Sequence, residues 1–239
     1  MTAALGWGAL AASSLVIGAL LGLIRPWPPR PLGLILAFGA GALISAVSFD
    51  LAQEGARLGD PGFLGLGLAV GAVTYFALNR MVGRRSRSRT ESDGDESAGS
   101  ALALGAFLDG IPEQAVLGIG IAAGDGVGVG LLVAIFVSNL PEAIGSSTEM
   151  RAAGTPPATI RRLWMLVALI CTAATVAGYA VADAVSGNLN AAVDGFAAGA
   201  LLVMLVDSMI PEAARKGGDV AGLVTVLGFA VAAALSSVS

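Results

Sequence analysis

Two Pro-Glu pairs lie within long apolar stretches of this sequence. Asp109 and Glu113 flank Pro112 in the first pair, and Glu142 follows Pro141 in the second. On a helix, residues four apart lie about 40° from each other, so the first two acids share a face. Clustered carboxylates supply the oxygen ligands that hard divalent cations prefer. These residue types at this spacing therefore predict cation binding.

Other oxygen donors lie beside the two glutamates. Proline has no N–H to donate, so Pro112 should free the carbonyl of Leu108, and Pro141 that of Val137. Helical spacing also places Glu142 on one face with two serines. The polar side chains that could complete an oxygen-rich site are Gln114, Ser138, Asn139 and Ser146.

Acids in such stretches need a compensating environment. A carboxylate in the middle of a membrane helix costs about 2.5–3.5 kcal/mol, and no Lys or Arg lies within these two stretches. The acids must be protonated, hold a cation or face a water-filled cavity. The alternative to a cation site is that protonated acids only join helices.

Three more acids extend this set. Asp207 lies in a later apolar stretch, where it either faces the same cavity or packs between helices. Glu212 follows it near the expected cytoplasmic surface, and Asp50 ends the second apolar stretch, where we expect a solvated entry position. Cys171 has no histidine partner and is expected to be a buried thiol.

The elements that position these residues are membrane helices. The chain has 239 residues, of which 56% are hydrophobic and 13% are charged, and histidine is absent. This composition excludes a disordered chain or a disulfide scaffold, and the net charge of −4 argues against nucleic-acid binding. Eight stretches are long and apolar enough to span a bilayer: 4–24, 31–51, 62–79, 101–123, 127–148, 159–182, 190–210 and 219–237.

Basic residues orient these spans. Twelve of the 13 lie in the loops that follow odd-numbered spans, and only Arg57 lies opposite, so those loops are expected to be cytoplasmic and both termini outside. Residues 80–100 are rich in charge and serine and predict a disordered cytoplasmic linker. The preference for arginine over lysine hints at a prokaryotic genome, so we expect a multi-pass protein of the prokaryotic plasma membrane.

The sequence also contains internal repeats. Residues 38–43 and 196–201 agree at five of six positions, and the same offset of 158 residues aligns Glu54 with Glu212. Residues 109–113 similarly resemble 138–142. In both cases the two copies lie in spans that run in opposite directions. Opposed repeats are typical of transporters whose site lies near the bilayer midplane.

Taken together, the Pro-Glu motifs, the eight spans and the long third loop resemble the Zrt/Irt-like (ZIP) divalent-metal transporters. The resemblance implies a single domain over 1–239, a 3+2+3 arrangement of the helices, and a passive or proton-linked carrier that holds no permanent cofactor and is not an enzyme. It suggests a homodimer. By position, it assigns metal binding to Asp109, Glu113, Asn139, Glu142 and Asp207. We expect accessory roles for Gln114, Ser138, Ser146, Asp50 and Glu212.

This chain departs from the family at both motif histidines, which are Asp109 and Ser138 here. Metal transport is implied, but the choice among Zn²⁺, Mn²⁺, Fe²⁺ and Mg²⁺ stays open, and oxygen ligands favour the harder cations. Two other functions remain. A relative that no longer transports would serve as a sensor or scaffold, and an Asp109–Asp207 pair would suit an intramembrane hydrolase.

Overall fold

The computed structural model describes residues 1–93, 110–122 and 129–236, and these form helices and turns without any strand. The predicted all-helical class is therefore confirmed. Besides the helix over 110–122, the elements are α1 (Thr2–Ile24), α2 (Pro29–Ala46), η1 (Val47–Gln53), α3 (Glu54–Leu58), α4 (Pro61–Asp93), α6 (Val129–Ala152), α7 (Pro157–Asp183), α8 (Asn188–Met204), η2 (Leu205–Met209), α9 (Ile210–Gly217), η3 (Gly218–Val220) and α10 (Ala221–Ser236).

Six stretches of the described residues are long and apolar enough to cross a membrane: Thr2–Ile24, Pro29–Leu58, Pro61–Met81, Val129–Ala152, Pro157–Asp183 and Asn188–Ser236. The last contains two of the predicted spans, which are separated at Gly218, where φ is 72°. A positive φ suits glycine because a side chain would clash there. Only 110–122 of the fourth predicted span is described, so eight spans remain a prediction.

Prolines start several helices where the turn residues predicted them. Pro29, Pro61 and Pro157 each begin a helix, because the first helical N–H needs no acceptor and proline lacks it. Pro141, in contrast, lies inside the continuous helix α6. The carbonyl of Leu108, which Pro112 is expected to free, lies outside the described residues.

Two helices extend beyond their predicted spans. The second continues through η1 and α3 to Leu58, so Asp50 lies within it and not at its end. The third, α4, passes the predicted end at residue 79 and continues to Asp93. The chain is thus helical where the linker was expected to begin, and residues 94–100 lie outside the described residues.

Glycines let the helix backbones approach closely. A Cβ on Gly118 would meet the carbonyl of Thr175, and one on Gly178 would meet that of Ala115, so the helix over 110–122 and α7 pack through paired glycines. The same reciprocal arrangement joins α2 to α10 and α4 to α8. Without a hydrophobic force between helices in lipid, small residues provide the close packing.

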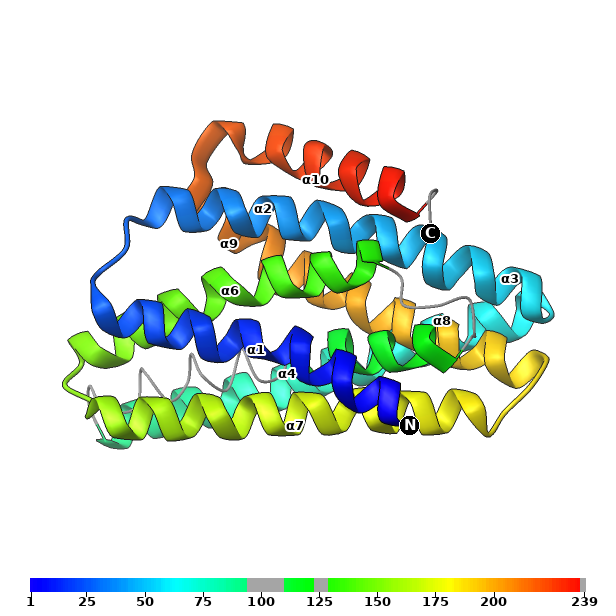
Figure 1. Ribbon diagram of the computed structural model, residues 1–239, viewed down its shortest axis with the longest axis horizontal. Coiled ribbons are helices and arrows are strands. Elements are labelled where there is room, and N and C mark those ends of the chain that lie inside the picture. Colours follow the sequence, from blue (N-terminus) through cyan, green and yellow to red (C-terminus); the bar gives the residue numbers. More distant parts are fainter. Residues whose placement is uncertain (94–109, 123–128, 237–239) are drawn as a thin grey trace.

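Two hydrophobic clusters meet at α6. One combines α1, α6 and α7, and the other combines α2, α8, α10 and the helix over 110–122 with α6. Figure 1 shows the α1–α2, α6–α7 and α9–α10 connections at one end of the molecule and the α3–α4 and α7–α8 connections at the other. Most of the described basic residues lie in or beside the first three connections, and which side of the membrane they face stays a prediction.

Candidate metal site

The two Pro-Glu motifs meet at Glu113 and Ser138. The Ser138 Oγ lies 3.3 Å from Oε1 and 3.2 Å from Oε2 of Glu113, and both side chains are buried. The hydroxyl also lies 3.0 Å from the carbonyl oxygen of Ile135. Because Ser138 lies on α6 and Glu113 on the helix over 110–122, this contact joins the two motifs that the sequence paired.

Glu142 lies one turn farther along α6, on the face that carries Ser138, and is half-buried. The carboxylates of Glu113 and Glu142 both lie close enough to the Cys171 thiol to act on it electrostatically. Both predicted glutamates therefore lie in the region where α6, α7 and the helix over 110–122 meet.

Gly110 and Asn139 border the same point. A Cβ on Gly110 would lie 3.0 Å from the Cys171 Sγ and 3.9 Å from Asn139 Oδ1. Asn139 is 1% exposed, and its Nδ2 has no hydrogen-bond partner among the described residues. The unpartnered atom is a hydrogen-bond donor, so Asn139 can offer a cation only its amide oxygen, which lies toward Gly110.

Gln114 is held by a neighbour that the sequence did not reveal. The Thr175 Oγ donates to Gln114 Oε1 over 2.6 Å, and both residues are fully buried. Ser146 is buried too, and its Oγ has no partner among the described residues. Cys171 and Thr175 are four apart on α7, and that helical spacing of polar groups was the available signal for a site-facing side.

The remaining predicted residues lie elsewhere. Asp207 is exposed in η2, and the structure does not gather it with Glu113 and Glu142 into one group. Asp50 is half-buried in η1 and hydrogen-bonded to Ser236, so its expected solvated position is wrong. Asp109 lies outside the described residues. Among those described, no three His, Cys, Asp or Glu side chains are close enough together to hold a metal ion.

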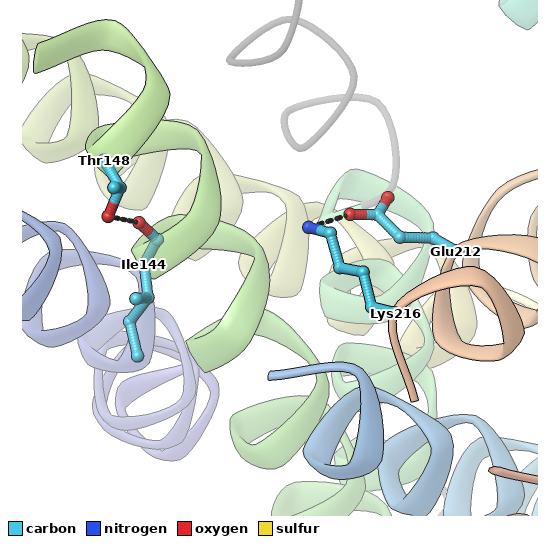
Figure 2. A network of polar contacts seen from close by, with 4 residues as sticks. All are labelled: Ile144, Thr148, Glu212 and Lys216. Carbon is cyan, nitrogen blue, oxygen red and sulfur yellow. Dashed lines mark hydrogen bonds and ion pairs between the residues drawn. The ribbon is translucent and has the colours of Figure 1, made fainter. Parts of the chain in front are cut away.

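Glu212 forms an ion pair with Lys216 on α9, with 2.5 Å between Oε1 and Nζ. Figure 2 shows both side chains reaching from α9 toward the part of α6 that carries Ile144 and Thr148. The Thr148 hydroxyl donates to the carbonyl of Ile144 one turn earlier over 2.7 Å, so its hydrogen bond stays within α6. Glu212 is therefore engaged by a lysine of its own helix.

Comparison with known proteins agrees with the family resemblance. A protein of Arabidopsis thaliana named "Putative zinc transporter" is 28% identical to this chain over 192 residues, which cover 79% of the chain and 31% of the relative. The chain thus spans about a third of the relative's length. No family model matches the chain. Together with the six apolar stretches, this similarity supports a multi-pass membrane protein.

Proposed function

We propose that this protein transports a divalent metal ion across the membrane, as a carrier of the ZIP type. The observation that carries the proposal is the buried contact between Ser138 and Glu113, which brings the two Pro-Glu motifs into one site. The name of the plant relative supports a transport role over an enzymatic one. The organism, the plasma membrane and a homodimer remain expectations from the sequence.

The proposed ligands are Glu113 and Glu142, with Asn139 and Ser138 beside them. The carboxylates supply charge to neutralise the cation and the Asn139 amide contributes a neutral oxygen, while the Ser138 hydroxyl holds Glu113 in position. Asp109 and Asp207 belong to the proposal only as residues of the resembled motif. Since metal ligands must be deprotonated, uptake should fall as the external pH is lowered.

The packing supports a 3+2+3 inverted repeat as part of this proposal. If α1, α2 and α4 are exchanged with α7, α8 and α10, the α2–α10 pair becomes the α8–α4 pair, and both pairs are extensive. The π-helical turns η1 and η2 begin at Val47 and Leu205, which are separated by the same offset as the sequence repeat. Two opposed halves of this kind suit alternating access to a central site.

The test is uptake into proteoliposomes, measured separately for Zn²⁺, Mn²⁺, Fe²⁺, Mg²⁺ and Ca²⁺. Glu113→Gln and Glu142→Gln keep the size of the side chain but remove its charge, so each should abolish uptake of the preferred cation. Asp183→Asn is the matched control, because Asp183 is exposed at the end of α7. Wild-type protein that moves none of the five cations would refute transport and favour a sensor or scaffold.

A further inference from the structure

The Glu212–Lys216 pair lies in an unusual place for an intrahelical ion pair. Pairs four residues apart are common on helix surfaces and contribute little to stability. Here the Lys216 side chain is only 16% exposed and that of Glu212 is 34% exposed. The Lys216 ammonium is therefore largely removed from solvent. The protein atoms around it then affect its stability more than the ion pair with Glu212 does.

That environment is the backbone of α6 at Gly145. A Cβ built on Gly145 would lie 3.3 Å from the Lys216 Nζ. Apart from the backbone of α6 itself, no other atom lies within 4 Å of that Cβ. The absence of a side chain at 145 is what allows the ammonium to rest against α6. Figure 2 shows the lysine extending across the space between α9 and α6 with its charge held by Glu212.

Gly145 lies in line with the proposed metal ligands. On α6, Ser138, Glu142 and Gly145 lie within about 60° of one another, and we call them the α6 stripe. Gly145 is three residues beyond Glu142, which is about 4.5 Å along the helix axis. It lies in the half of α6 that leads to the α6–α7 connection, the end expected to be cytoplasmic.

We propose that Lys216 closes the cytoplasmic end of the α6 stripe as a resident counter-cation that the transported ion must displace. The inference rests on the proposed function and adds a regulating residue to the same pathway. A compact ammonium on a flexible four-carbon stem repels a divalent ion while it stays in place, and it can swing aside without moving the backbone. Glu212 holds it in the closed position.

The direct test measures access to the stripe from the cytoplasmic side. Ser146 is 6% exposed and adjoins Gly145, so Ser146→Cys in a Cys171→Ala background provides a single buried reporter thiol. Inside-out vesicles are treated with a membrane-impermeant maleimide. Lys216→Met should speed labelling about fivefold, the scale of one partly exposed ion pair. Arg215→Met, an exposed neighbour on α9, should change the rate less than twofold.

A charge swap separates closure by a cation from a simple helix clasp. Glu212→Lys combined with Lys216→Glu keeps an ion pair within α9 but places a carboxylate against Gly145. If the cation closes the stripe, the swapped protein labels as fast as Lys216→Met. Labelling at the wild-type rate in either variant would overturn the proposal, and the swap decides the question if Lys216→Met does not fold.

The labelling result is independent of transport. Fast labelling of the Lys216 variants with no cation uptake by wild-type protein would refute the proposed function but support closure by Lys216. Uptake by wild-type protein with unchanged labelling of the Lys216 variants would support the proposed function and refute closure by Lys216. If both transport and closure by Lys216 hold, proteoliposomes that contain Lys216→Met and are preloaded with Mn²⁺ should release the ion faster than proteoliposomes that contain Arg215→Met.

Discussion

Replacement of Ser138 by alanine tests whether the contact between the Pro-Glu motifs acts on the cation. A hydroxyl that donates to a carboxylate normally lies 2.5–2.7 Å from it, and such bonds contribute about 1.5–3 kcal/mol. The Ser138 Oγ lies 3.2 and 3.3 Å from the oxygens of Glu113 and can donate to Ile135 instead. The contact should therefore contribute only about 1 kcal/mol, which is about fivefold in affinity.

The assay is the concentration of Mn²⁺ or Zn²⁺ that half-saturates uptake into proteoliposomes. Ser138→Ala should raise it about fivefold with little change in the maximal rate, and Ser138→Thr should keep the wild-type value. Ser147→Ala is the control, because Ser147 is equally buried on α6 but faces α1. A shift below twofold would refute the argument, and loss as complete as in Glu113→Gln would make Ser138 a ligand in its own right.

Three further predictions concern the scaffold, each measured as the apparent melting temperature of the detergent-solubilised chain. Gly118→Ala should lower it strongly, because the new Cβ would meet the Thr175 carbonyl, whereas Gly120→Ala has room beside Leu131 and should change it little. Equal effects would contradict the glycine packing. Thr175→Val should lower the free energy of unfolding by about 1–2 kcal/mol, because it leaves the buried Gln114 amide oxygen without its donor. Thr175→Ser should keep most of the wild-type stability. An unchanged melting temperature in Thr175→Val would mean that water replaces the hydroxyl. Deletion of Ser48 within η1 should be tolerated, since a π turn holds one residue more than an α turn, whereas deletion of Ala40 in α2 should unfold the protein; similar losses from both deletions would count against a true π turn.

The helical framework could be predicted from the sequence because its signals are local. Apolar stretches of about 20 residues predict spans without reference to the rest of the chain, and prolines such as Pro29 and Pro157 begin helices for a reason that depends only on the first turn. The sequence also indicated that the segments of Glu113 and Ser138 act together, because the two motifs resemble each other, and the structure brings these two residues into contact.

The position of Asp207 could not be predicted in the same way. A helical face is extrapolated along a chain by assuming 3.6 residues per turn. Asp207 lies inside the π turn η2, where that period fails and every later side chain is rotated from its expected direction. The same reasoning applies to Asp50 in η1. Both acids were assigned from their place along an apolar stretch, and Asp207 also from the resembled motif, and neither basis gives the direction of a side chain within a π turn.

The two π turns lie at equivalent places in the sequence repeat. Irregular hydrogen bonding is costly in lipid, where an unsatisfied backbone group finds no water, so a π turn persists only where the surrounding packing holds it. Here it occurs in both halves at the same offset as the sequence repeat, and the residue of the repeat that follows each turn is an acid, Glu54 or Glu212. In the second half that acid holds Lys216 against α6. In the first half, Glu54 pairs with Arg57 at 3.5 Å, at the opposite end of the molecule. Each half thus places an acid–base pair just beyond its π turn, but the Lys216 side chain is 16% exposed and that of Arg57 is 66% exposed, so the two pairs differ in how far they are removed from solvent.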